Sequence, residues 1–313
     1  MQEKAYTPTV LRTLTDQILD QVSSIILGKP QQVRLAIACL LAKGHILIED
    51  LPGVGKTTLA HTLGRTLGLE FQRIQFTSDL LPADILGISV YRRETSNFHF
   101  HPGPIFSQLI LADEINRATP KTQSALLEAM EEGQVTSEGE TRALPQPFFV
   151  IATQNPADQV GTFPLPESQL DRFLMRITLG FPDAASERLL LQGKNRRNMV
   201  NTMKASISLT ELVQLQHAVT QVHIAEPLLD YLQAILTITR NHNEIHSGLS
   251  PRAGLAVKSA TQAWALLQGR NYAQPEDIQA VLMAVVSHRL RNRNLEPFEP
   301  EHLKKILFAV PVR

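Results

Sequence analysis

The sequence has little cysteine, no long apolar run and no excess of charge of either sign. Its 313 residues contain one cysteine, Cys39, which excludes a disulfide framework and favours a reducing compartment. No apolar run approaches the length that spans a bilayer, and residues 1–20 lack the apolar stretch of a secretion signal. We therefore expect a cytoplasmic protein without membrane insertion.

The charges balance, because the chain has thirty lysine and arginine residues and thirty aspartate and glutamate residues. A global electrostatic attraction to nucleic acid is therefore absent, although a local basic patch stays open. Hydrophobic residues make up 43% of the chain, which is enough for a sizeable core, and the length suits two domains. The composition indicates a globular protein and disfavours a nucleic-acid partner.

The most informative stretch, residues 49–58, suits a loop around phosphate. The apolar run at residues 46–48 is typical of a buried strand, and leucines at four-residue spacing after the loop favour a helix. The first turn of a helix leaves amide N–H groups unpaired and attracts anions. Strand, loop and helix in this order therefore predict a binding site for the phosphates of a nucleotide.

The residue types within this loop match that chemistry. Gly53 and Gly55 let the backbone fold around a phosphate without a Cβ in the way. Lys56 supplies a cation to the terminal phosphates, and Thr57 supplies a hydroxyl to Mg²⁺. The strict pattern begins with glycine where this chain has Asp50, so the turn is expected from the Pro-Gly pair instead. The residues expected to bind the nucleotide are Pro52, Gly53, Val54, Gly55, Lys56, Thr57 and Thr58. A plain helix entry is the weaker interpretation, because strand, glycines and helix are all in place.

A short apolar segment upstream of the loop, residues 25–28, ends in Gly28. In a nucleotide-binding protein such a segment suits the cover of an adenine, and we include Gly28 among the candidate binding residues. An ordinary turn between two helices is an equally good interpretation of the same spacing.

A second apolar strand, residues 109–112, runs into Asp113 and Glu114. Neighbouring residues on a strand point to opposite sides, so the two carboxylates should do different work. Asp113 is expected to hold Mg²⁺ through its water shell, and Glu114 to orient and deprotonate a water aimed at the γ-phosphate. The alternative is a strand leading into a helix, where acidic residues are favoured anyway. The preceding phosphate loop favours the catalytic interpretation.

Two further polar residues are candidates for contacts with the nucleotide. Asn155 follows a third apolar strand, and it either bridges the attacking water and the γ-phosphate or is a turn residue before proline. Ser250 and Pro251 suit the cap and first residue of a helix, so that Arg252 projects from its first turn toward a nucleotide at the domain junction. Without a phosphate loop, a surface arginine would be the better interpretation of Arg252.

The pattern of the sequence changes near residue 182. Before it, strands and helices alternate, and two β-hairpins are expected within residues 79–104 and 133–147. After it, apolar residues recur only at helical spacing. We predict an α/β domain over residues 1–182 and a helical domain over residues 183–313.

The order of these motifs resembles that of the AAA+ ATPases, and the residues within the motifs are more similar still to those of the MoxR family. The matching segments are residues 44–57, 112–118, 123–130, 153–156, 165–173 and 249–253. The resemblance covers nearly the whole chain and is weakest before residue 24 and between residues 194 and 208. It implies a three-layer αβα P-loop domain with a parallel sheet, followed by a smaller all-helical lid domain.

The resemblance also implies a role for each motif residue. Lys56 and Thr57 match Walker A, and Asp113 and Glu114 match Walker B. Asn155 matches sensor 1 and Arg252 matches sensor 2. Arg172 resembles an arginine finger that reaches the nucleotide of an adjacent subunit. The two hairpins resemble inserts that face the pore or substrate side of a ring.

By this resemblance the chain is an ATP hydrolase that uses ATP and Mg²⁺ at the subunit interfaces of a homo-oligomeric ring, commonly a hexamer. The family is associated with chaperone activity in maturing or activating protein complexes, including metal-cofactor insertion, alongside von Willebrand factor A domain proteins. The alternatives are a nucleic-acid-remodelling AAA+ motor, a magnesium-chelatase-like motor subunit and a scaffold that binds ATP without turnover. The balanced charge disfavours the first, and the presence of both Glu114 and Arg172 disfavours the last.

Overall fold

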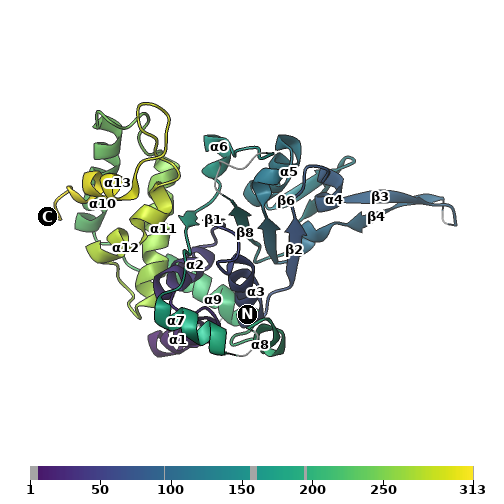
Figure 1. Cartoon of the computed structure of the whole chain (residues 1–313), viewed down its shortest axis with the longest axis horizontal. Coiled ribbons are helices and arrows are strands. Elements are labelled where there is room, and N and C mark those ends of the chain that lie inside the picture. The colour runs from purple at the N-terminus through teal and green to yellow at the C-terminus, as the bar shows by residue number, and fades with distance from the viewer. Residues whose placement is uncertain (1–5, 95, 156–160, 194–195, 313) are drawn as a thin grey trace.

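The computed structural model describes residues 6–94, 96–155, 161–193 and 196–312 (Figure 1). Pro156, the last residue of one matching segment, lies outside these ranges. The α/β part contains α1 (Pro8–Ile25), α2 (Pro30–Leu41), β1 (Ile46–Glu49), α3 (Lys56–Thr66), β2 (Phe71–Gln75), α4 (Pro82–Leu86), β3 (Gly87–Arg92), β4 (Asn97–Pro102), η1 (Pro104–Phe106), β5 (Leu109–Asp113), η2 (Ile115–Arg117), α5 (Pro120–Glu132), β6 (Gln134–Ser137), β7 (Glu140–Ala143), β8 (Phe149–Gln154), α6 (Glu167–Leu170) and β9 (Met175–Ile177). The helical part contains α7 (Ala184–Gln192), α8 (Arg196–Thr202), α9 (Leu209–Thr220), α10 (Glu226–Asn241), α11 (Pro251–Leu267), α12 (Pro275–Val286) and α13 (Pro300–Phe308).

Within the described residues, five parallel strands form one sheet in the order β2-β5-β8-β1-β9. Alternate residues of these strands face opposite sides. Ile46 and Ile48 join the apolar cluster that includes α2 and α3, whereas Leu47 joins the cluster that includes α5. Helices therefore cover both faces, which confirms the predicted three-layer arrangement (Figure 1).

The parallel arrangement decides where the predicted site residues gather. The carboxyl ends of β1, β5 and β8 lie at the same edge of the sheet, because these strands pair in parallel with each other. The phosphate loop, the two carboxylates and Asn155 all follow these ends. One expectation was wrong in detail: β5 ends at Asp113, and Glu114 lies beyond it in the left-handed backbone region, with φ 58°.

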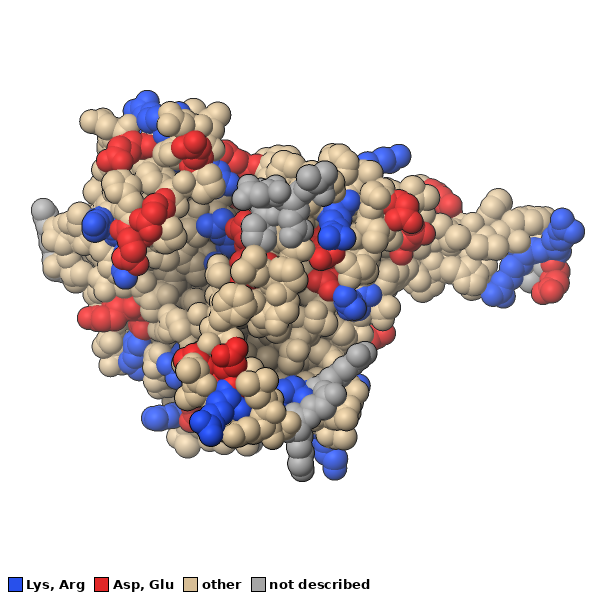
Figure 2. Space-filling view, viewed as in Figure 1, with Lys and Arg blue, Asp and Glu red and all other residues tan. Residues whose placement is uncertain are grey.

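Two β-hairpins lie within the ranges where hairpins were expected. The first pairs β3 with β4 and the second pairs β6 with β7, each antiparallel. Figures 1 and 2 show the first hairpin projecting far from the body of the molecule. The guanidinium of Arg142 lies over the ring of Phe100, 3.8 Å from its centre, and so connects the two hairpins. Figure 2 shows basic and acidic side chains interspersed on this face, without one extended basic surface.

The helical part packs on the α/β part in two places. Helices α8 and α9 contact α3 and α2, whereas α11 contacts α2 and α12 contacts β9. One apolar cluster runs from α1 and α2 into α11 and α12. Within the described residues, no helix combines the length and apolar character needed to cross a membrane.

His45 is a half-buried titratable group just before the amino end of β1. Its Nε2 lies 3.2 Å from the Met130 carbonyl oxygen, and its Nδ1 accepts from the Val150 amide at 3.0 Å. Both bonds suit a neutral ring with its proton on Nε2. Burial lowers the pKa of His45 from 6.5 to about 4, and the bond to Met130 opposes this shift.

The low pKa of His45 predicts that the folded state loses stability in mild acid. Between pH 6.5 and about 4 the unfolded chain binds a proton that the folded chain excludes. His45 should therefore lower the free energy of unfolding by at most about 1.4 kcal/mol per pH unit, as pH drops through this window. Urea unfolding at pH 7.0 and 5.5 measures it. His45→Gln should flatten the dependence, whereas the exposed control His217→Gln should not; equal slopes for all three proteins would refute the assignment.

Candidate functional site

The phosphate loop connects β1 to α3 at the carboxyl edge of the sheet. Gly53 and Gly55 adopt φ of 86° and 97°, and a Cβ added at either position would meet no atom within 4 Å. Their backbone conformation, rather than crowding, therefore calls for glycine, and the space beside the loop is open. Among the other predicted loop residues, Pro52 and Thr57 are exposed, and Val54 and Thr58 are half-buried.

Lys56 connects the loop to β8. Its Nζ donates to the Asp50 carbonyl oxygen at 2.6 Å and to Asn155 Oδ1 at 3.1 Å. Burial lowers the pKa of Lys56, and the carboxylates of Asp50, Asp113 and Glu114 oppose that shift. The structure thus brings the predicted cation, the predicted amide and both predicted carboxylates into one cluster.

A single hydroxyl, that of Thr153, organises the two carboxylate residues. Thr153 Oγ1 donates to Asp113 Oδ1 at 2.6 Å and accepts from the Glu114 amide at 2.9 Å. The second bond stabilises the left-handed backbone at Glu114, which costs free energy for a residue with a Cβ. The two carboxylates consequently leave the strand in different directions.

Three side chains hold the Glu114 carboxylate in place. Asn155 Nδ2 donates to Oε1 at 2.9 Å, and Gln75 Nε2 donates to Oε2 at 3.1 Å. Arg117 Nε lies 3.1 Å from the same Oε2. Such support fixes the orientation of a carboxylate without filling all its acceptor positions, which suits a base that must bind a water.

Two polar residues of β2, Arg73 and Gln75, belong to the site although no motif contains them. Arg73 donates to Asp113 Oδ2 from Nη2 at 2.6 Å and from Nε at 3.0 Å, and to Gln75 Oε1 at 2.6 Å. The two residues share one face of β2, whose parallel neighbour is the strand that ends in Asp113. The sequence does carry one signal for them: they are polar residues two apart on the strand that pairs with β5.

Asp50 explains why this loop begins without glycine. Its Oδ2 accepts from the amides of Leu179 and Gly180 at 2.7 and 2.6 Å, and its Oδ1 accepts from the Leu51 amide at 2.7 Å. The Asp50 side chain is buried. It therefore ties the phosphate loop to the segment that leads into the helical part.

We expect Asp50→Ala to lower the free energy of unfolding by about 1–3 kcal/mol, because it leaves the buried Leu179 amide without its acceptor. Chemical denaturation measures the loss. Asp50→Asn, which keeps one acceptor oxygen, should lose less. An Asp50→Ala protein as stable as the wild type would show that water satisfies these amides equally well.

Gly28 lies against this same connecting segment. It has φ 70°, and a Cβ there would come within 2.6 Å of Ser186 Oγ in the first turn of α7. The next residue, Lys29, donates to the Phe181 carbonyl oxygen. The predicted contact of Gly28 with an adenine stays a prediction.

The two remaining candidates, Arg172 and Arg252, lie at the opposite edge of the sheet. The segment before β9 meets the amino end of β1, since the Leu174 amide donates to the His45 carbonyl oxygen at 2.8 Å. Arg172 belongs to this segment and forms an ion pair with Glu131, in the last turn of α5, at 3.0 Å. Lys56 follows the other end of β1. The two ends of this strand are roughly 13 Å apart, at about 3.3 Å per residue.

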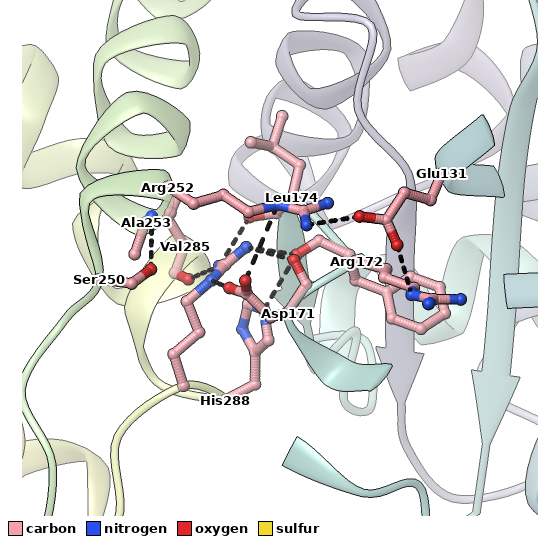
Figure 3. Close-up of polar contacts among 11 residues, drawn as sticks. Glu131, Asp171, Arg172, Leu174, Ser250, Arg252, Ala253, Val285 and His288 are labelled. Atoms are coloured by element: carbon pink, nitrogen blue, oxygen red, sulfur yellow. Dashed lines mark hydrogen bonds and ion pairs between the residues drawn. The ribbon is translucent and has the colours of Figure 1, made fainter. Parts of the chain in front are cut away.

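Arg252 shares this location with Arg172. Its Nη1 donates to Glu131 Oε1 at 2.8 Å, and its Nε lies 3.8 Å from Asp171 Oδ2 (Figure 3). In this chain Arg252 therefore contacts the end of α5 rather than its own phosphate loop, because the first turn of α11 packs against that end. The predicted contact of Arg252 with a nucleotide stays a prediction. Ser250 does cap this helix as predicted, accepting from the Ala253 amide at 3.1 Å.

Comparison with known proteins adds the family context. The profile of the ATPase family associated with various cellular activities (AAA) matches residues 45–175, and that of the AAA lid domain matches residues 237–306. Chaperone MoxR1 of Mycobacterium tuberculosis is 40% identical, over 88% of this chain and 75% of the relative. The uncharacterized protein YeaC of Bacillus subtilis is 44% identical, over 90% of this chain and 88% of the relative. A solved structure from Cytophaga hutchinsonii, described as a "putative ATPase", is 34% identical with a TM-score of 0.87, over 97% of this chain and 96% of the other.

Proposed function

The chain belongs to the MoxR family of AAA+ ATPases, and from this premise we propose that it hydrolyses ATP at sites shared between two copies of itself. The carboxyl edge of one copy binds the nucleotide. The amino edge of a second copy supplies Arg172 and Arg252. Repetition of such a head-to-tail contact generates a closed ring, and we propose a hexamer.

The carboxyl edge has the donors that ATP and Mg²⁺ require. The open backbone at Gly53 and Gly55 suits phosphate, and the buried Lys56 ammonium supplies the cation. Thr57 and Asp113 offer the hard oxygen ligands that would hold Mg²⁺. When bound, the ion neutralises charge on the phosphate oxygens.

We assign the chemical step to residues that the structure holds together. Glu114 takes a proton from the attacking water, and Asn155 orients this carboxylate while its Oδ1 contacts Lys56. Proton transfer and positioning are the main work left to the protein, since phosphoryl transfer depends on placement and charge.

The main support for a shared site is that its residues lie at two opposite edges of the sheet. Arg172 and Arg252 contact Glu131 beside the amino end of β1, while Lys56 and Glu114 lie beyond its carboxyl end. A guanidinium that stabilises charge on the transferred phosphoryl group must contact it. A second copy satisfies this requirement without any rearrangement of the sheet.

We further propose that hydrolysis drives a chaperone activity in the cytoplasm, directed at a client protein complex together with a von Willebrand factor A domain partner. The printed name of the MoxR1 relative, a chaperone, supports the general activity. The bond between Asp50 and the Leu179 and Gly180 amides supports a coupling of the phosphate loop to the helical part. Metal-cofactor insertion is the specific outcome that we propose for the client.

Phosphate release from ATP with Mg²⁺, measured alongside molecular mass, tests the proposed function. The wild type should release phosphate and form rings in ATP, and Lys56→Ala should release none because it cannot bind the terminal phosphates. Absence of turnover by an assembled wild-type ring, with or without candidate partners, would favour a nucleotide-gated scaffold instead.

A further inference from the structure

Glu131 is the centre of an arginine cluster that we define by Glu131, Asp171, Arg172, Arg252 and Arg289. Figure 3 labels the first four of these residues. Each oxygen of the Glu131 carboxylate contacts a different arginine. Oε2 lies 3.0 Å from Arg172 Nε, and Oε1 accepts from Arg252 Nη1 at 2.8 Å. The hydrogen bond from Arg252 lowers the pKa of Glu131, and the charge of Arg172 adds to the shift. One carboxylate thus bridges arginines from two separate elements.

The bridge leaves each guanidinium able to bind an anion. Guanidinium carries five N–H donors in a planar fork, and Glu131 contacts one nitrogen of each. The side chains of Arg172 and Arg252 keep 25% and 53% of their surface exposed. Two positive charges share one negative charge, so the bridged pair retains a net positive charge.

The helical part fixes the segment that carries Arg172. Arg289, whose side chain is 6% exposed, donates to Asp171 Oδ1 at 2.6 Å and to the Phe173 carbonyl oxygen at 2.7 Å. Asp171 Oδ2 in turn lies 3.8 Å from Arg252 Nε. A movement of the helical part would therefore displace Arg172 and Arg252 together rather than separately.

We propose that Glu131 is a positioning residue, which presents Arg172 and Arg252 as one two-arginine clamp for the terminal phosphate of ATP bound to a second copy of this chain. The inference rests on the proposed function of the shared site. The clamp binds a phosphate anion that is held at the carboxyl edge of the second copy. Because unused N–H donors remain on both arginines, the clamp binds the phosphate with the Glu131 bonds intact.

The alternative is a lock, in which Glu131 withholds the arginines until they are released. The two models predict opposite changes in ATP turnover when the carboxylate is removed. Removal of a positioning carboxylate lowers turnover because the guanidiniums lose their alignment. Removal of a lock raises it.

The test is Glu131→Gln, with Glu132→Gln as a matched control on the exposed neighbouring position. We expect Glu131→Gln to lower kcat by about tenfold or more. The dissociation constant for ATP should change far less than kcat, because the phosphate loop of each copy binds the nucleotide without Glu131. Molecular mass in ATP should show rings as for the wild type. Glu131→Asp, which keeps the charge, should recover part of kcat, and Glu132→Gln should match the wild type.

Three results would overturn the inference. They are a raised kcat in Glu131→Gln, an unchanged kcat, or a loss that follows the loss of rings with no recovery in Glu131→Asp. If Glu131→Gln does not fold, Glu131→Asp decides alone, with an intact ring and lowered kcat in support and a wild-type kcat against. A wild-type ring without turnover would instead contradict the proposed function, so the two failures are distinguishable.

Discussion

Replacement of Arg172 by alanine is expected to lower ATP turnover about 10³- to 10⁵-fold, the range typical of an arginine that stabilises the transferred phosphoryl group. ATP binding should persist, since Arg172 lies beside the amino end of β1 and the phosphate loop follows its carboxyl end. Arg172→Lys should restore little, because an ammonium lacks the planar fork. Steady-state phosphate release and nucleotide titration measure the two effects.

The control for Arg172 is Arg188→Ala, at an exposed position of α7. It removes the same charge and should leave turnover unchanged. Near-wild-type turnover in Arg172→Ala would show that the finger assignment is wrong. A parallel loss of ATP binding would show that Arg172 contributes to the nucleotide site in another way.

Glu114→Gln is expected to lower turnover about 10²- to 10⁴-fold, the usual contribution of a general base. Glutamine preserves the size of the side chain and an acceptor for Asn155 Nδ2, but it cannot take the proton of the attacking water. ATP should therefore stay bound and unhydrolysed. Binding of ATP by fluorescence titration, together with phosphate release, separates the two properties.

Glu128→Gln, at an exposed position of α5, is the matched control for Glu114 and should behave as the wild type. Normal turnover in Glu114→Gln would assign the base to another group. Loss of ATP binding would instead mean that Glu114 supports the binding site rather than the chemical step.

The carboxyl edge was predictable because its signals are local. A strand, a loop with two glycines and a helix entry specify the phosphate loop within a dozen residues, and parallel pairing brings the ends of β5 and β8 beside it. The left-handed conformation of Glu114 was not predictable, since it depends on a hydroxyl 39 residues away in Thr153.

The amino edge was predictable only in part, because its contacts are formed between distant elements. Arg172 was assigned to an adjacent subunit by resemblance alone. The contact of Arg252 with Glu131 was not predictable, since only the packing of α11 decides what its first turn faces. No motif connects Glu131 to the arginines 41 and 121 residues further along the chain.

The central claim is that each catalytic site takes residues from two copies, and mixing two inactive variants tests it most directly. Lys56→Ala lacks the nucleotide site, and Arg172→Ala lacks the finger. In a mixed ring, an Arg172→Ala copy binds ATP beside the intact Arg172 of a Lys56→Ala copy. We predict phosphate release from the mixture well above that of either variant alone. A mixture no more active than its two components, under conditions where the wild type is active and the variants assemble together, would contradict the shared site.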